Sequence, residues 1–274
     1  MAAELDLLPF ALVYGGLAIL APLLAMMERR TPAVHLTRTR RGLRLDLAYW
    51  LITPIFTGSF ARAFTLGVIG TLALVSGFGL HGTSFLARAT AHSPFAKLPL
   101  LPAFFVALVV ADFLGYLSHR LRHERAFWRV HAVHHATEEL TAIAAARLHP
   151  LDEAVDSVLI GVPVLLLGFP LAVYAALGPF FVLHTLLLHA NVPWTFGPLG
   201  RVFASPRFHR RHHARELPAA NYGGVFAIYD VLFGTFDMAG AEPVLFGISE
   251  RDVPETLWGQ CVYPLKRALF EHDS

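Results

Sequence analysis

Long apolar runs without a charged residue constrain this chain more than any other feature. Residues 8–27 form such a run of about twenty residues, and at a rise of about 1.5 Å per residue this is long enough for one helix to cross a bilayer. Hydrophobic residues make up 55% of the chain and only 15% are charged, with a mean hydropathy of +0.53. The sequence therefore predicts an integral membrane protein rather than a water-soluble domain.

Further apolar stretches predict the remaining spans. Residues 47–75 are long enough for a tilted crossing or one kinked at Pro54, and residues 99–117 would cross back. Residues 155–167 and 171–188 are separated by a Gly-Phe-Pro turn and predict two spans or a helical hairpin, the first of which is short enough to be re-entrant.

The loop between the first two spans fixes the expected orientation. It contains Arg29, Arg30, Arg38, Arg40, Arg41 and Arg44. Because short loops rich in Arg and Lys stay in the cytoplasm, this loop is expected there and the N-terminus outside. Glu4 and Asp6 stand where a secretion signal would be basic, so the first span is expected to be retained.

These observations predict an all-α fold, a transmembrane helical bundle of four to five spans or hairpins with a cytoplasmic histidine-rich helical cap. We expect N-terminal spans and loops over residues 1–100, a histidine-rich domain over 101–240 and a cytoplasmic tail over 241–274. Net charge is only +2, so nucleic acid is not an expected partner. With Cys261 as the only cysteine, a disulfide within the chain and a thiolate cluster are excluded, and any metal needs nitrogen or oxygen ligands.

Histidines gather in the middle of this apolar chain. Of the fifteen, eleven lie between positions 119 and 213. Their spacings are H-x3-H, H-x2-HH, H-x4-H and a second H-x2-HH, formed respectively by His119 and His123; His131, His134 and His135; His184 and His189; and His209, His212 and His213. Residues three or four apart share a helix face, so each group can aim its imidazoles at a common centre.

Two interpretations of this cluster compete. Interfacial histidines can hydrogen-bond to headgroups, and the neighbouring Arg120, Arg122, Arg125 and Arg129 fit an anion-attracting collar. So many imidazoles at one depth would each need a partner, however, and a metal satisfies them together. Ten ring systems exceed the four to six ligands of one ion and suit two, so we expect a dinuclear site in which iron, zinc, copper and nickel all remain candidates.

Helix geometry adds a condition on this site. On one straight helix His119 and His135 would lie about 24 Å apart, too far to reach one centre. We therefore expect the helix to bend within Glu124–Trp128, so that the two boxes occupy separate helical segments that converge with the His209 box.

The histidine pattern resembles the membrane-bound fatty acid hydroxylase/sterol desaturase superfamily, whose boxes are H-x3-4-H, H-x2-3-HH and H-x2-3-HH. The resemblance runs from about Asp112 to Asp237 and includes DFLGYLSHRLRH, FWRVHAVHH, RLHPLDE, LLLHANV, SPRFHRRHH, NYG and DVLFGTFD. It implies a di-iron oxygenase that uses O2 and two electrons to hydroxylate or desaturate an unactivated C–H bond of a membrane lipid. The chain without an attached electron-transfer domain looks like the bacterial members of this superfamily, which implies an inner-membrane location.

Carried over by position, the resemblance implies ten iron ligands: His119, His123, His131, His134, His135, His184, His189, His209, His212 and His213. His149, Asp112, Asn221, Tyr222 and Asp230 would support them from outside the coordination sphere. No catalytic group beyond the ligands is implied. Electrons would come from a separate donor, a ferredoxin or a cytochrome b5 with its reductase.

Two other classes of function compete with a lipid oxygenase. A membrane metal-binding or transport protein should place histidines at successive depths across several spans, whereas here they are expected on one side. A zinc-dependent lipid hydrolase would need a general base or a nucleophile, and the sequence offers neither a spare glutamate beside the ligands nor a G-x-S-x-G motif.

Overall fold

The computed structural model describes residues 2–36, 40–248 and 253–270, and in these ranges the chain is helical, with one isolated antiparallel bridge between Ala214 and Phe246 as its only β pairing. The α-helices, in chain order, are α1 (Ala2–Arg30), α2 (Arg40–Ile52), α3 (Gly58–Val75), α4 (Gly82–Thr90), α5 (Leu100–Arg122), α6 (Arg125–His135), α7 (Pro150–Asp156), α8 (Val162–Leu166), α9 (Leu171–His189), α10 (Pro206–His212), α11 (Ile228–Phe233) and α12 (Leu257–Phe270). The predicted all-α class is confirmed.

Four helical segments are long and apolar enough to cross a membrane: Ala11–Arg30, Gly42–Val75, Leu100–Arg122 and Leu171–His189. They correspond to the four longest predicted spans. The short stretch 155–167 is not among them, because it is divided into the end of α7, a π-helical turn (Ser157–Gly161) and α8. Gly168, with φ +72°, then ends this segment before α9 begins.

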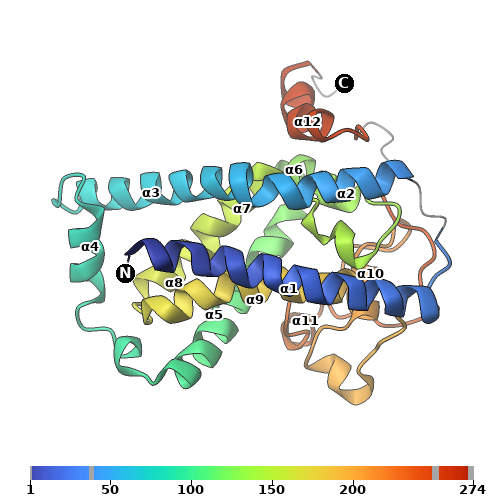
Figure 1. Ribbon diagram of the computed structural model, residues 1–274, viewed down its shortest axis with the longest axis horizontal. Coiled ribbons are helices and arrows are strands. Elements are labelled where there is room, and N and C mark those ends of the chain that lie inside the picture. The colour runs from blue at the N-terminus through green and yellow to red at the C-terminus, as the bar shows by residue number, and fades with distance from the viewer. Residues whose placement is uncertain (1, 37–39, 249–252, 271–274) are drawn as a thin grey trace.

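The second span is continuous through its proline. A π-helical turn over Thr53–Thr57 joins α2 to α3, and Pro54 lies within that turn. Because proline lacks an N–H and its ring clashes with the preceding turn, the wider π geometry lets the helix pass it without ending. The expected crossing of residues 47–75 is therefore part of one long continuous helix, which runs horizontally through α3 and α2 in Figure 1.

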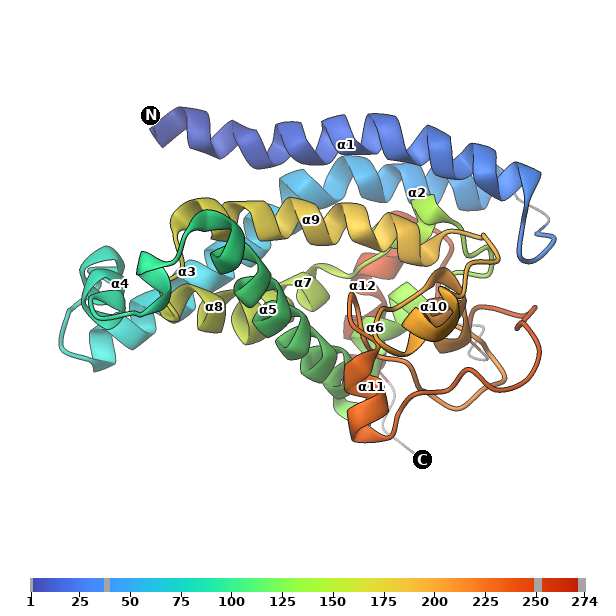
Figure 2. The same cartoon turned by 90° about the horizontal axis from the view of Figure 1, so that it is seen from below.

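The bundle holds the histidine-bearing elements at one end. Helix α1 packs along α9, which also contacts α5 and α10 (Figures 1 and 2). One apolar core joins α1 and α9 through Leu24, Leu186 and Ala190, and a second joins α5 and α9 through Ala107 and Val173. Helices α6, α10, α11 and α12 gather at the end of the bundle where α9 finishes.

Candidate metal centre

The helix that carries the first two histidine boxes is broken between them. Helix α5 ends at Arg122, His123 follows as its C-cap, and Glu124 has extended backbone with ψ 147° before α6 begins at Arg125. The predicted bend is thus confirmed, and it lies at Glu124, the first residue of the expected range Glu124–Trp128. Since α6 leaves in a new direction, His119 and His135 can approach a common centre.

Nine histidines converge into two groups. The five-histidine site contains His119, His123, His131, His135 and His212, and the four-histidine site contains His134, His189, His209 and His213. Within each group one ring nitrogen of every member lies within 4.8 Å of the others. The three boxes predicted to converge do so, and residues from α5, α6, α9 and α10 meet in two adjacent sites.

Helical spacing explains how two boxes serve both sites. On α6, His131 and His135 are four residues apart and face the five-histidine site, whereas His134 faces the other. On α10, His209 and the C-cap His213 share the face toward the four-histidine site, and His212 points to the five-histidine site. Each H-x2-HH box therefore supplies ring nitrogens to both groups.

Burial keeps these imidazoles neutral. The pKa values of His131, His135 and His209 lie well below the ordinary value for histidine, because desolvation disfavours the charged ring and repulsion from neighbouring histidines, and from Arg122 in the case of His131, adds to it. The same causes lower the pKa of His123 to about 2, and burial lowers that of His212 to about 4. A neutral imidazole is the form that binds a metal.

Hydrogen bonds to backbone carbonyls fix the tautomer of several rings. In the four-histidine site, Nδ1 of His134 donates to the Arg147 carbonyl at 3.0 Å and Nδ1 of His189 donates to the Thr185 carbonyl at 2.9 Å. In the five-histidine site, Nδ1 of His119 and of His212 donate to the carbonyls of Tyr222 and Ala220, at 2.8 and 2.7 Å. Because a neutral ring carries one proton, each of these Nε2 atoms presents a lone pair.

These lone pairs face each other, and their arrangement decides whether a cation fits the two sites. The Nε2 atoms of His134 and His189 lie 3.3 Å apart, and both are unprotonated. The Nε2 of His119 is buried without a hydrogen-bond partner among the described residues. Facing lone pairs in a buried site repel unless a cation lies between them, so the donor set of both sites suits a nitrogen-liganded metal ion.

A buried carboxylate supports His131. Oδ1 of Asp152 lies 3.5 Å from Nδ1 of His131 and 3.6 Å from the Arg122 guanidinium, which also pairs with Asp156 at 3.1 Å. Burial raises the pKa of Asp152 to about 7. Asp152 was not among the predicted support residues, although it lies three residues after His149 in the RLHPLDE stretch.

Replacing Asp152 with asparagine is expected to lower the metal affinity of the five-histidine site about 10- to 100-fold, as is usual when a carboxylate behind a ligating histidine is lost. Competition with a chelator measures this affinity. Asp156→Asn is the matched control, because Asp156 pairs with Arg122 but contacts no histidine of the site in the described residues. Equal loss in both variants would assign the effect to the arginine pair.

Two histidines of the predicted set lie elsewhere. The structure places His184 in neither group: its Nε2 lies 3.4 Å from the Gly224 carbonyl. His149 caps α7, since its Nδ1 accepts from the Leu151 N–H and its Nε2 donates to the Cys261 carbonyl. Both nitrogens of His149 are thereby used by backbone groups, so the expected hydrogen bond from His149 to a ligand is replaced by a structural cap.

The other predicted support residues hold one loop. Asp230 accepts from the N–H groups of Tyr222 and Gly223, both at 2.8 Å, and Asp112 accepts from those of Val225 and Phe226, both at 2.8 Å. Neither carboxylate contacts a ligand directly. Both fix the loop whose Tyr222 carbonyl orients His119, so they act through the backbone.

Asn221 anchors the start of the same loop. Its backbone is left-handed, with φ 61°, a conformation that asparagine tolerates better than most residues. Its side-chain amide donates to the carbonyls of Phe208 and Asp237, and its side-chain oxygen accepts from the Asp237 N–H at 2.7 Å. Asn221 thus joins this loop to α10 rather than to a histidine ring.

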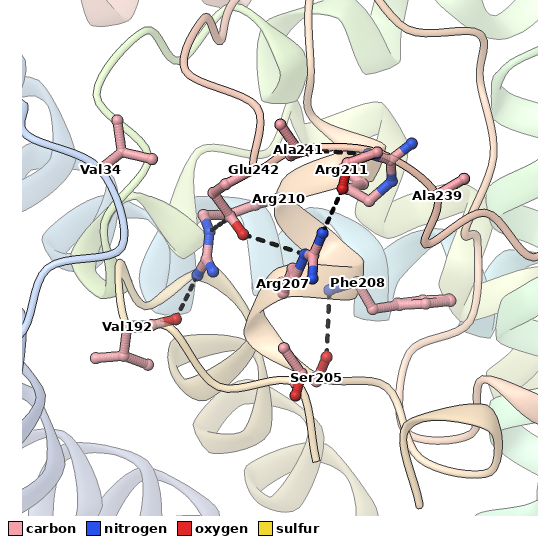
Figure 3. Close-up of polar contacts among 12 residues, drawn as sticks. Val34, Val192, Ser205, Arg207, Phe208, Arg210, Arg211, Ala239, Ala241 and Glu242 are labelled. Atoms are coloured by element: carbon pink, nitrogen blue, oxygen red, sulfur yellow. Dashed lines mark hydrogen bonds and ion pairs between the residues drawn. The ribbon is translucent and has the colours of Figure 1, made fainter. Parts of the chain in front are cut away.

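Arginines of α10 hold the helix of the last histidine box through hydrogen bonds and ion pairs (Figure 3). Arg210 is fully buried; its guanidinium bonds Glu242 at 2.5 Å and donates to the carbonyls of Ala190 and Val192 at 3.0 and 2.7 Å. Ala190 directly follows His189 at the end of α9, and Val192 lies two residues further along. The arginine that follows His209 in sequence therefore joins α9 and α10, two of the three helices that supply the four-histidine site.

Fold and site together define a class: a helical protein with spans long enough for a membrane and, at one end of the bundle, buried histidine groups that could hold metal. Residues 104–235 match the family model described as fatty acid hydroxylase. Ornithine lipid hydroxylase OlsE of Rhizobium tropici is 34% identical over 240 residues, which cover 85% of this chain and 69% of the relative. The chain belongs to the fatty acid hydroxylase superfamily, as the histidine pattern suggested.

Other relatives match over the histidine region. The alkylglycerol monooxygenase of Homo sapiens is 34% identical over 146 residues, 52% of this chain and 32% of the relative. The Delta(7)-sterol 5(6)-desaturase ERG3A of Gibberella zeae is 30% identical over 132 residues, 48% of this chain and 36% of the relative. No solved structure matches the chain significantly. The relatives are oxidoreductases that act on lipids by name, and this chain is an oxidoreductase of their superfamily.

Proposed function

We propose that the protein is a membrane-bound di-iron oxygenase whose substrate is a membrane lipid. It either inserts one oxygen atom into an unactivated C–H bond of that lipid or removes two hydrogen atoms from the lipid to form a double bond. Hydroxylation consumes O2, two electrons and two protons and yields an alcohol and one water; desaturation with the same reductant yields an alkene and two waters. The observation that carries the proposal is the pair of buried sites in which neutral imidazoles aim unprotonated nitrogens at one another.

The proposed iron ligands are the nine histidines of the two sites: His119, His123, His131, His134, His135, His189, His209, His212 and His213. Iron bound there would supply the reduction of O2 and the oxidant for the C–H bond. Neutral nitrogen ligands leave the full charge of the metal uncompensated, which favours an electrophilic centre. His184, outside both groups, is not in this set.

Groups of the chain itself orient the histidine rings and shield them from water in this proposal. Backbone carbonyls hold four rings in the tautomer that leaves Nε2 free, and Asp152 faces His131. Burial of the histidines limits the access of water, which would otherwise compete with the lipid for the oxidant.

The names of the relatives favour hydroxylation of a polar membrane lipid over desaturation. The relative matched along most of this chain is an ornithine lipid hydroxylase, and alkylglycerol monooxygenases also add oxygen to a lipid by name. The desaturase match covers only the histidine region.

The proposed location is a bacterial inner membrane with the active site toward the cytoplasm. Arg29 and Arg30 end α1 beside the end of α9, so the basic boundary and the histidines lie at the same end of the bundle. Basic segments near spans favour the cytoplasmic side. A separate ferredoxin or cytochrome b5 with its reductase would deliver electrons from that side.

Metal analysis of the protein purified anaerobically in detergent tests the dinuclear site. We expect about two iron ions per chain, since each group has enough ligands for one ion. Two zinc ions would support a dinuclear site and reopen the hydrolase alternative, because zinc binds nitrogen sites more tightly than Fe(II). A folded protein that binds no metal would contradict the proposal.

A further inference from the structure

The last turn of α1 carries one acidic side chain that contacts the fold and two basic side chains that are exposed. Glu28 faces inward, where its Oε1 accepts from the Ala142 N–H at 2.7 Å and the Asn191 N–H at 3.0 Å. Arg29 and Arg30 are exposed and form no hydrogen bond or ion pair with the part of the chain that the structure describes. The acid thus contacts the fold, while both cations are exposed at the end of the candidate span.

Two adjoining grooves meet at Arg29. The first has a volume of about 370 Å³ and is lined by Pro22, Ala25, Met26, Arg29 and Arg30. The second has a volume of about 290 Å³, shares Ala25 and Arg29 with the first, and is also lined by His35, Thr141 and Asn191 among others. An apolar trough along α1 therefore leads to a polar pocket at the end of the helix.

A buried hydroxyl in the polar pocket lacks a partner. Thr141 is only 6% exposed, and its Oγ1 has no hydrogen-bond partner among the described residues. Its neighbour Glu28 already accepts two N–H groups. The pocket therefore offers a guanidinium and a hydroxyl as donors, and an unmade hydrogen bond at a buried group costs stability.

We propose that these grooves bind an anionic phospholipid, with its phosphate at Arg29, Arg30 and Thr141 and an acyl chain along Pro22, Ala25 and Met26. Arginine pairs with phosphate oxygens through two parallel hydrogen bonds, and the Thr141 hydroxyl can donate a third. Phosphate next to hydrocarbon is the chemistry of a phospholipid at the boundary of a bilayer. This site is separate from the metal centre and does not depend on the proposed reaction.

The pocket also touches the segment that ends α9. Asn191, two residues after His189, lines it and bonds Val34 through both side-chain ends, accepting at 3.0 Å and donating at 2.7 Å. A lipid bound there would brace the junction of α1, the loop after it and the end of α9. We therefore expect bound lipid to raise the thermal stability of the whole protein.

Native mass spectrometry of the full chain in detergent tests the proposal with two lipids of matched acyl chains, phosphatidylglycerol and diacylglycerol. One phosphatidylglycerol should remain bound per chain, and diacylglycerol should not. Arg29→Gln/Arg30→Gln should reduce retention about tenfold, and Thr141→Val should reduce it several-fold, as expected when charged and neutral hydrogen bonds are lost. Arg44→Gln, which removes an exposed charge near the start of α2, is the control and should bind as wild type does.

Equal retention of both lipids, or unchanged retention in the Arg29 and Thr141 variants, would overturn the proposal. Inorganic phosphate separates the two possible sources of the anion. If it displaces the lipid at equal concentration, the apolar trough contributes nothing and the lipid assignment fails. Both arginines are exposed and valine matches threonine in shape, so these variants should fold.

Discussion

Replacing His134 with alanine is expected to empty the four-histidine site and abolish turnover while leaving the protein inserted in the membrane. His134 supplies one of the four ring nitrogens proposed to bind metal there, and its Nε2 lies 3.3 Å from that of His189. A catalytic metal supplies several kcal/mol, and each ~1.36 kcal/mol is a tenfold change in rate, so turnover should fall about a thousandfold or more. Lipid mass spectra of expressing cells should lose the product that carries one added oxygen atom.

Metal content makes this prediction independent of the substrate. The His134→Ala protein should retain about one metal ion per chain instead of about two, because the five-histidine site keeps all its ligands. His92→Ala is the matched control, since His92 is exposed and belongs to neither site. Wild-type turnover together with wild-type metal content in His134→Ala would remove the proposed metal assignment.

The sequence was sufficient for the parts of this structure that depend on local spacing. Apolar runs, two of which contain one charged residue each (Arg62 and Asp112), located the four long spans, and the distance between His119 and His135 along one helix required the break that occurs at Glu124. The four-residue intervals also placed His131 with His135, and His209 with His213, on common helix faces. These features follow from helix geometry and need no knowledge of tertiary contacts. The expectation that each whole group would aim at one centre is wrong for both H-x2-HH boxes, because each is divided between the two sites.

The division of the histidines between two sites could not be predicted in the same way. His134 and His135 are adjacent in sequence yet serve different sites, because consecutive helical residues point in different directions and only the positions of α9 and α10 decide what each one meets. His184 and His189 lie on one helix, but only His189 reaches a site. Spacing identified the candidates, and tertiary packing selected among them.

The supporting contacts were the least visible part of the site. Three of the four carbonyls that accept from ring Nδ1 atoms belong to Arg147, Thr185 and Ala220, whose side chains give no sign of this role. The fourth is the carbonyl of Tyr222, the one residue of the four that was expected to support a ligand. Every residue has a carbonyl, so only the folded backbone shows which ones are used.

Arg147 shows how such a contact is held from a distance. Its carbonyl accepts from His134, while its side chain pairs with Asp46 at 2.5 Å and donates to the Gly42 carbonyl at 3.1 Å. Both partners lie in the first turns of α2, so the second span helps to set the orientation of a histidine in the four-histidine site. The N-terminal spans therefore contribute to the site as well as to membrane insertion.

Replacing Glu242 with alanine is expected to have the largest effect on stability outside the histidines. It leaves the fully buried Arg210 without its carboxylate and also removes the contact from Arg207 at 3.3 Å. Breaking a fully buried pair costs about 3–5 kcal/mol, and because the Glu242 side chain is 25% exposed we expect a loss of about 2–3 kcal/mol in the free energy of unfolding. Chemical unfolding in detergent measures it.

Metal should leave the four-histidine site first in this variant, because Arg210 joins α10 to the two carbonyls that follow His189. Glu138→Ala is the control: its carboxylate also pairs with an arginine, Arg215, but is 73% exposed and should cost at most about 1 kcal/mol. If the two variants lose equal stability, Glu242 does not stabilise the buried positive charge of Arg210.

Adding Arg210→Met to Glu242→Ala separates the charge of Arg210 from its hydrogen bonds. Methionine removes the uncompensated buried cation, so stability should recover in part. It also leaves the Ala190 and Val192 carbonyls without their donor, so metal should still be lost from the four-histidine site. Recovery of stability without recovery of metal would show that Arg210 positions the end of α9 as well as balancing charge, whereas recovery of both would reduce its role to the ion pair.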